Sequence, residues 1–261
     1  MRKLFFVIVC IQLFLFPPAR AASVRAVTMC VDSDPPPPGS LKLDSNGKKI
    51  IPVEGATIDI VRAAFTRLGI PIEFNADMPW KRCLLEVEEG IIDFALGVYF
   101  NDERAKVYDY STHYNTLTPQ IFYRASNPVH ITRASDLKKF RGCGIYGSSY
   151  VHYQINSDDL VMGSDYDSLY RKLLAGRCDY FAEELEPVYE SNNGKNFLAN
   201  PLIRHIGAEW ATRPARHLIT AKNGPDSALL VQIDAALESV IKSGQAEQLW
   251  KKTMGDLPYM P

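Results

Sequence analysis

The stretch EEGIIDFAL, residues 88–96, decides the fold, because the sequence uses the same pattern a second time. The second copy is LAGRCDYFA, residues 174–182. In each copy a helical pattern ends at a glycine, two residues lead to an aspartate, and an apolar strand follows. One supersecondary unit used twice predicts two α/β lobes, in which helices cover a sheet.

Helical and strand patterns alternate around each copy. Residues 55–69 place apolar side chains at helical spacing and end at Gly69, and a helix with Pro79 at its start leads into the first copy. The tail, residues 226–255, predicts two helices that are separated by Gly244 and pack on the first lobe. Around the second copy, strands are predicted at residues 143–147 and 160–163, and helices at residues 148–155 and 167–176. Ligands of such sheets bind at the carboxyl ends of the strands, so two facing lobes predict a cleft.

The N-terminus has the three parts of an export signal. A basic start is followed by an apolar run at residues 4–16 and by the small-residue cleavage signal ARA at residues 19–21. A bilayer span needs about 20 apolar residues, so this run is short for a membrane anchor. We predict a signal peptide over residues 1–22, cleaved after Ala21 or Ala22, and a periplasmic location. An uncleaved anchor is the alternative.

Charge and cysteine content narrow the function classes. The formal net charge at pH 7 is −1, and it becomes −4 without residues 1–22, which hold three basic residues and no acid. This balance does not favour nucleic acid, whose partners carry a basic face. Four cysteines remain, and in an exported protein they predict two disulfides in one of three pairings, with buried free thiols as the alternative. Their spacing contains no C-x-x-C motif, so no metal or cofactor is expected.

Five segments in this order resemble family 3 of the periplasmic solute-binding proteins, the amino-acid-binding receptors of ABC importers. The segments are GATIDIVRAAFTRLGI (55–70), MPWKRCLLEVEEGIIDFALGVYFNDERAKVYDYS (78–111), DLKKFRGCGIYGSS (136–149), LLAGRCDYFAEE (173–184) and GQAEQLWKKTMG (244–255). The resemblance implies a two-lobed α/β fold of the Venus-flytrap (type II) class, in which each lobe is a mostly parallel sheet flanked by helices. It also implies a monomer that delivers its solute to an ABC permease at the inner membrane.

The resemblance further implies how the chain is divided. Lobe 1 is expected to hold residues 23–117 plus 210–261, and lobe 2 residues 118–209. The two hinge crossings are expected near residues 114–119 and 202–210. Closure of two such lobes around a ligand is an ordinary hinge motion.

The same resemblance implies which residues hold the ligand. Arg104 matches the family's carboxylate-binding arginine. The chemistry suits this role, because a guanidinium meets a carboxylate with two parallel hydrogen bonds. A surface ion pair with Asp102 or Glu103 is the alternative. Trp80 matches an aromatic wall of the ligand site, with a place in the core as the alternative. Glu184 matches the acid that pairs with an α-ammonium group, where the family usually carries aspartate.

Four further positions match the family less specifically. Glu183 competes with its neighbour for the role of the acid, and a solvated acidic loop is the alternative for both. Ser148 and Ser149 match small hydroxyl residues at a helix start, where backbone N–H groups attract an anion, with plain helix capping as the alternative. Asp32 matches an acid near the amine pocket, and an ordinary turn residue is the alternative.

The loop between Asp93 and Arg104 departs from the family pattern. It is one residue shorter, and Tyr99 stands where the family carries serine and threonine donors. A phenol hydroxyl can bond a ligand, but its ring takes room. We include Gly97 and Tyr99 among the expected ligand-binding residues.

The cysteines fit the same frame. Cys30 and Cys83 are expected near one edge of lobe 1, and Cys143 and Cys178 near the starts of two strands of lobe 2. The predicted disulfides are therefore Cys30–Cys83 and Cys143–Cys178, each worth about 2–4 kcal/mol if unstrained.

The predicted function is capture of a small zwitterionic or carboxylate solute, without chemistry. The alternative is an exported enzyme on the same fold, similar to cyclohexadienyl dehydratase, with Glu184, Tyr99 or His113 as the acid or base. A detached sensory binding domain is the third hypothesis. The five histidines are scattered, and we interpret each as a loop or surface residue.

Overall fold

The computed structural model describes residues 25–31, 42–43, 49–50, 53–76, 78–191 and 194–261. Two features predicted from the sequence lie outside these residues: the export signal over residues 1–22 and the candidate ligand residue Asp32. In the part of the chain that is described, no helix has the length and apolar character needed to cross a membrane.

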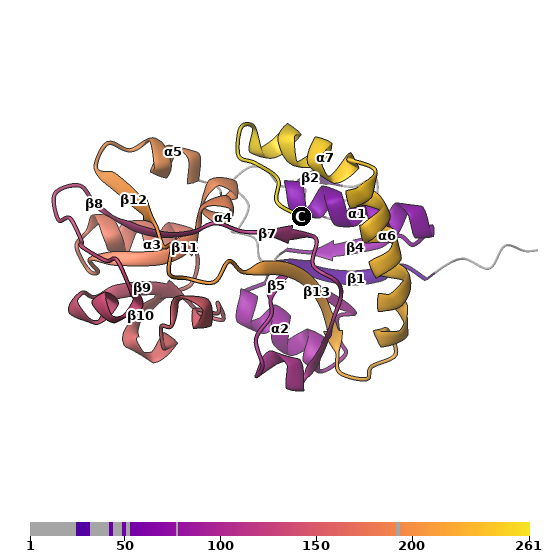
Figure 1. The fold of residues 1–261 in the computed structure, drawn as a ribbon. Helices are drawn as coiled ribbons and strands as arrows, with labels where there is room; N and C mark the ends of the chain where they lie inside the picture. Colours follow the sequence, from indigo (N-terminus) through magenta and orange to yellow (C-terminus); the bar gives the residue numbers. More distant parts are fainter. Residues whose placement is uncertain (1–24, 32–41, 44–48, 51–52, 77, 192–193) are drawn as a thin grey trace, which may run out of the picture.

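The chain forms two sheets with helices packed around each, and Figure 1 shows them side by side. The first sheet and its helices form the first lobe, and the second sheet and its helices form the second lobe. The first sheet has the order β4-β1-β5-β13-β6, with β7 also paired to β13. Its strands are β1 (Val27–Val31), β4 (Ile72–Asn75), β5 (Phe94–Tyr99), β6 (Tyr108–Tyr110), β7 (Asn115–Thr116) and β13 (Ala215–Ala221).

The second sheet has the order β10-β9-β11-β8-β12. Its strands are β8 (Pro119–Arg124), β9 (Gly142–Ile145), β10 (Leu160–Gly163), β11 (Tyr180–Glu184) and β12 (Ile203–Gly207). A separate antiparallel pair joins β2 (Lys42–Leu43) and β3 (Lys49–Ile50). The helices are α1 (Ala56–Leu68), α2 (Trp80–Glu88), α3 (Tyr166–Leu174), α4 (Leu185–Glu190), α5 (Gly194–Ala199), α6 (Leu230–Lys242) and α7 (Gln245–Met254).

Both sheets are mixed, whereas the sequence predicted mostly parallel ones. The strands of the repeated units run parallel: β1 pairs with β4 and β5, and β9 pairs with β10 and β11. The strands next to the crossings, β8 and β13, pair antiparallel with their neighbours. The reason is that the chain enters each of these strands from the other lobe, and so runs back along the sheet.

The chain crosses between the sheets twice. The first crossing lies between β7 and β8, within the expected region of residues 114–119. The second lies at residues 208–214, between β12 and β13, and so begins later than the expected residues 202–210. The difference arises because β12 pairs with β8 at the edge of the second sheet before the chain leaves it.

The repeated unit has the same construction in both lobes. Gly90 and Gly176 adopt left-handed φ angles of 70° and 71°, as a glycine after a helix does. Asp93 then accepts a hydrogen bond from the backbone N–H of Thr28 at 2.7 Å, and Asp179 accepts one from that of Arg141 at 2.9 Å. Each aspartate therefore joins the start of its own strand to the start of the neighbouring parallel strand.

The cores follow the apolar faces predicted for the helices. In the first lobe, α1, α6 and α7 bury Phe65, Leu237 and Trp250 in one cluster with residues of β1 and β5. Gly244 has a φ of 74° and separates α6 from α7, as predicted. The other face of this sheet packs on α2.

The helix predicted at residues 148–155 is wrong. Only a 3₁₀ turn forms, at Val151–Tyr153, and Gln154 ends it with a φ of 58°. The buried hydroxyl of Tyr150 accepts a hydrogen bond from the backbone N–H of Ile145 at 2.8 Å and donates one to Glu183 at 2.6 Å. These contacts hold Tyr150 under the sheet and override the local preference for a longer helix.

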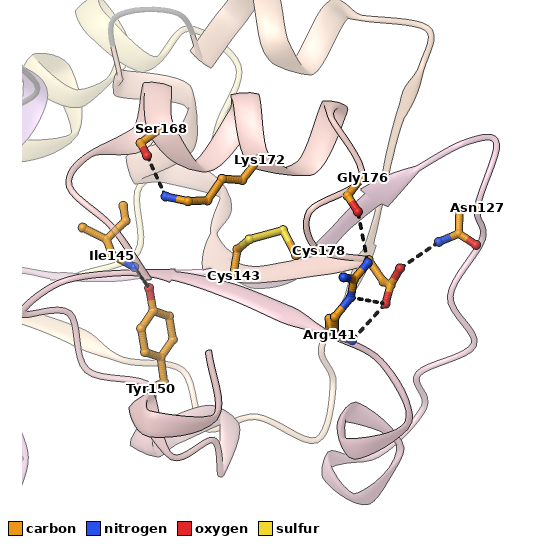
Figure 2. Close-up of a disulfide and its surroundings, with 10 residues drawn as sticks. Asn127, Arg141, Cys143, Ile145, Tyr150, Ser168, Lys172, Gly176 and Cys178 are labelled. Carbon is orange, nitrogen blue, oxygen red and sulfur yellow. Dashed lines mark hydrogen bonds and ion pairs between the residues drawn. A yellow bond between two sulfur atoms is a disulfide. The ribbon is translucent and has the colours of Figure 1, made fainter. Parts of the chain in front are cut away.

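The predicted disulfide pairs are the ones found, Cys30–Cys83 and Cys143–Cys178. The first joins β1 to α2 in the first lobe. The second joins β9 to the turn before β11 in the second lobe, as Figure 2 shows, and packs in the cluster with α3.

We expect the double substitution Cys143→Ala with Cys178→Ala to lower the free energy of unfolding by about 3 kcal/mol. The bond closes a segment with a sequence separation of 35 residues, so its loss frees the unfolded chain. Urea unfolding of the variant and of the oxidised and reduced wild type measures the change. An unfolding free energy equal to that of the oxidised protein would contradict this prediction.

Candidate functional site

The two lobes touch where β5 and β11 end. Tyr99 is the last residue of β5, and Glu184 is the last residue of β11. The hydroxyl of Tyr99 donates a hydrogen bond to Glu184 Oε2 at 2.6 Å. Because the carboxyl ends of strands are the usual place for ligands in α/β folds, this contact marks the candidate site.

A β-bulge at Gly97 directs Tyr99 toward the second lobe. The pairing of β5 with β13 shifts between His217 and Leu218, which skips Gly97, and Gly97 has a φ of 89°. Its backbone N–H donates instead to the hydroxyl of Tyr114 at 2.9 Å. An extra residue in one strand turns the following side chains to the other face of the sheet. Gly97 therefore positions Tyr99, and a direct contact with a ligand is not needed to explain it.

Glu184 lies in a cage of donors. Only 1% of it is exposed, and its Oε1 lies 2.6 Å from His152 Nε2. Glu183 is also buried, but its carboxylate accepts hydrogen bonds from the hydroxyls of Tyr150 and Tyr166, at 2.6 and 3.4 Å. The alternative that Glu183 and Glu184 lie in a solvated acidic loop is therefore wrong. Of the two, Glu184 is the acid that contacts the first lobe.

The surroundings keep Glu184 ionised. Burial acts to raise the pKa of this carboxyl, but hydrogen bonds from His152, Tyr99 and Tyr153 and the charge of His152 outweigh it and hold the pKa below the usual 4.5. Burial and the neighbouring charge of Glu184 raise the pKa of the Tyr99 hydroxyl well above its usual value. The pair is therefore an ionised acceptor with a neutral donor.

This lowered pKa predicts a pH dependence of stability. Unfolding returns Glu184 to its ordinary pKa of 4.5, so the unfolded state binds the proton more readily. The stabilisation is present above that pH and is lost as the pH falls through the lower folded pKa. We expect the melting temperature of the wild type to exceed that of Glu184→Gln most at neutral pH, with the difference shrinking below pH 4.5. A pH-independent difference would show that the charge of Glu184 is not involved.

Arg104 lies on the same contact between the lobes. It begins a 3₁₀ turn, and its backbone N–H donates to Asn101 Oδ1 at 2.8 Å. Its half-buried guanidinium donates to the carbonyl of Tyr99 at 3.1 Å and to that of Gly147, in the second lobe, at 2.7 Å. Glu103, the alternative ion-pair partner, forms its salt bridge with Lys106. The structure thus places Arg104 against the opposite lobe.

Trp80 and the two serines lie near Arg104. Trp80 is 7% exposed and packs with the Cys30–Cys83 disulfide, as the core alternative predicts. Its Cδ1 lies 3.1 Å from the position that a Cβ on Gly147 would take. Ser149 Oγ accepts a hydrogen bond from Asn101 Nδ2 at 3.2 Å across the lobes. Ser148 donates its backbone N–H to the turn carbonyl of Ile145, so no helix start presents this group to an anion.

A second polar contact between the lobes was not predicted from the sequence. Arg216 of β13 is 8% exposed and donates to Thr57 Oγ1 at 2.5 Å and to Glu190 Oε2, of α4, at 3.2 Å. The other oxygen of Glu190 accepts the backbone N–H of Ala56, the first residue of α1, at 3.1 Å. Burial acts to lower the pKa of Arg216, but the charge and hydrogen bond of Glu190 and the neighbouring Tyr99 and Tyr114 together raise it above its usual value, and the guanidinium stays charged. A lone arginine within the strand pattern RHLITA was the available signal.

His152 was also missed, since all five histidines were interpreted as loop or surface residues. Its side chain is only 10% exposed. The ring lies edge-on to that of Tyr99, with 5.8 Å between the ring centres. His113, proposed as a catalytic group in the enzyme hypothesis, instead has an exposed side chain and contacts the ring of His217.

The buried amide of Asn115 completes a polar row. Asn115 lies opposite Arg216, and Arg216 lies opposite Tyr99, so the three side chains share one face of the first sheet. Asn115 is fully buried, and neither atom of its amide has a hydrogen-bond partner among the described residues. An unsatisfied buried amide is costly, and a water or a ligand group can satisfy it. In the described part of the chain, no three acidic, histidine or cysteine side chains are grouped to hold a metal ion.

Comparison with known families gives one match that covers most of the chain. Residues 27–256 match the family described as bacterial extracellular solute-binding proteins, family 3. No curated protein matches the sequence.

Solved structures with the same fold include carriers and a sensor. A histidine kinase sensor domain with similarity to periplasmic binding proteins shares 22% identity over 90% of this chain and 98% of its own, with a TM-score of 0.69. The substrate-binding protein AbpA of an amino acid ABC transporter of Streptococcus pneumoniae, bound to L-arginine, shares 24% over 87% and 94%, with a TM-score of 0.67. The arginine-, lysine-, histidine-binding protein ArtJ of Geobacillus stearothermophilus shares 21% over 90% and 97%, with a TM-score of 0.68. At these identities the likeness shows the two-lobed fold.

Proposed function

Because the chain belongs to family 3 of the bacterial extracellular solute-binding proteins, we propose that it captures a small, amino-acid-like carboxylate or zwitterion between its two lobes. The observation that carries the proposal is the position of Arg104, whose guanidinium reaches from the first lobe to the carbonyl of Gly147 in the second. Two of its acceptors are the backbone carbonyls of Tyr99 and Gly147. The planar guanidinium matches the geometry of a carboxylate, which accepts charge-assisted hydrogen bonds about twice as strong as neutral ones.

Closure around the solute requires groups on both lobes. Tyr99, Arg104 and Arg216 belong to the first lobe, and Glu184 and Glu190 to the second. We propose that lobe 1 holds residues 23–117 plus 210–261 and lobe 2 residues 118–209, and that they move as two bodies about the crossings. Trp80, Ser148, Ser149 and Asp32 stay in the proposed ligand site, and Gly97 supports it by positioning Tyr99.

The proposal extends to transport. AbpA belongs to an amino acid ABC transporter, and ArtJ binds arginine, lysine and histidine. By analogy, we propose that this protein is exported to the periplasm after cleavage of residues 1–22 and delivers its solute as a monomer to an ABC permease. The two disulfides support an oxidising compartment.

A sensory role is the second candidate, because a histidine kinase sensor domain has the same fold. Binding by itself does not separate a carrier from a sensor. Loss of uptake of the labelled ligand after deletion of the gene supports transport, whereas normal uptake with lost transcriptional response supports sensing. For the enzyme hypothesis, the lowered pKa of Glu184 makes this carboxyl a poor proton donor at neutral pH.

A ligand panel tests the proposal. The purified mature protein is heated with amino acids, simple carboxylates, small peptides and polyamines, and a ligand at 100 times its dissociation constant stabilises it by about 2.7 kcal/mol. Each compound that raises the melting temperature is recovered and identified by mass spectrometry. An unchanged compound supports binding and a converted one supports an enzyme, while a panel without any carboxylate ligand contradicts the proposal.

A further inference from the structure

Glu184 already has partners from its own chain on both oxygens. Its Oε2 accepts the Tyr99 hydroxyl and its Oε1 contacts His152 Nε2, each at 2.6 Å. In the charged form of His152, and in the neutral tautomer that carries its proton on Nε2, the ring donates a hydrogen bond to this oxygen. The ring of Tyr153 packs against that of His152 at an interplanar angle of 45°, with 4.4 Å between the ring centres, and so covers a further side of the cage.

An ammonium group has no favourable entry to this cage. It brings three N–H donors and needs acceptors for them, but Glu184 is only 1% exposed. To reach Oε2 it must displace the Tyr99 hydroxyl, which then loses its acceptor inside a buried site. An ammonium group that moves from water into a site where it finds no acceptor loses affinity for the same reason.

The charges around this contact have both signs. Glu184 acts on the Tyr99 hydroxyl more strongly than Arg216 does, and Arg216, opposite Tyr99 on β13, is paired with Glu190. A cation is therefore attracted here chiefly by the Glu184 carboxylate, whose two oxygens already contact Tyr99 and His152.

We infer that Tyr99 and His152 set the ligand class. They contact both oxygens of Glu184, the acid that would otherwise bind an α-ammonium group, so the site takes carboxylates without an α-ammonium group. This inference rests on the proposed function and narrows it from zwitterions and carboxylates to organic anions. Tyr99 supplies from the first lobe the hydrogen bond to Glu184 that the amine of an amino acid would make. The contact forms between the lobes, so the protein's own side chain completes the closed site.

Matched ligand pairs test the inference on the wild-type protein. Each pair shares a carboxylate and a side chain and differs in the α-amino group: glutarate and glutamate, hydrocinnamate and phenylalanine, isocaproate and leucine, guanidinovalerate and arginine. Isothermal titration calorimetry measures both members. We expect the member without the amine to bind about tenfold more tightly in every pair that binds. An amino acid that binds as tightly as its partner, or more tightly, places its ammonium elsewhere and overturns the inference while leaving the proposed function intact.

Absence of binding for every pair has a different meaning, because it overturns the proposed function and this inference with it. The two failures are therefore distinguishable in one experiment.

The variant Tyr99→Phe tests the role of the hydroxyl. It removes the hydrogen bond to Glu184 Oε2 and little else. We expect the affinity for the amino acid, relative to that for its amine-free partner, to rise by about tenfold. Tyr110→Phe is the matched control, because the Tyr110 hydroxyl is buried in the first lobe without a hydrogen-bond partner among the described residues. A ratio that is the same in Tyr99→Phe, Tyr110→Phe and the wild type overturns the assignment of specificity to Tyr99.

Discussion

Arg104→Ala is expected to abolish binding of carboxylate ligands while the fold remains intact. The guanidinium offers two parallel donors, and each hydrogen bond to a charged partner contributes about 1.5–3 kcal/mol, so the dissociation constant should rise by roughly a hundredfold or more. In the structure the same side chain bonds to the carbonyls of Tyr99 and Gly147 from a half-buried position. Its loss there costs at most about 1.5–3 kcal/mol per bond, because the donor is charged and partly exposed.

Calorimetry with the ligand found in the panel measures the change, and circular dichroism confirms the fold. Arg82→Ala is the matched control, because this arginine lies on α2 with its exposed side chain paired to Glu86. Near-normal affinity in Arg104→Ala would contradict both the role of Arg104 and the observation on which the proposed function rests.

Glu190→Ala is expected to open the lobes. The substitution leaves Arg216 buried without its charged partner, which costs about 3 kcal/mol in the closed arrangement. Opening relieves this cost, because the guanidinium then reaches water. The ratio of closed to open molecules should fall by roughly a hundredfold, and the affinity for the ligand should fall with it.

Small-angle X-ray scattering of the ligand-free protein detects the opening as a larger radius of gyration. Glu247→Ala, an exposed position on α7, is the control for loss of one acidic charge. Scattering and affinity that match those of the control would show that Glu190 does not hold the lobes together.

The parts of the fold that depend on local signals could be predicted from the sequence. Gly90 and Gly176 end their helices through a backbone conformation that glycine adopts readily, so the repeated unit was visible without any tertiary contact. The pairing of β8 and β13 was not visible, because it depends on where the chain returns after it has crossed to the other lobe. The helix predicted at residues 148–155 failed for a similar reason, since a buried tyrosine in it bonds to a residue 33 positions away.

The candidate site shows the same division. Arg104, Tyr99 and Glu184 stand in motifs that the family resemblance identifies, and the structure brings them to one contact between the lobes. Arg216 was missed because its partners lie 159 and 26 residues away in the sequence, and His152 because its partner lies 32 residues away. The motif flagged Gly97, but only the strand register shows that it acts through Tyr99.

Both disulfides have their two ends within a single lobe. Neither crosslink therefore ties one half to the other, and the hinge movement that we propose would keep its range whether the thiols are oxidised or reduced. Oxidation is expected to make each half more resistant to unfolding without limiting the proposed movement of one half against the other.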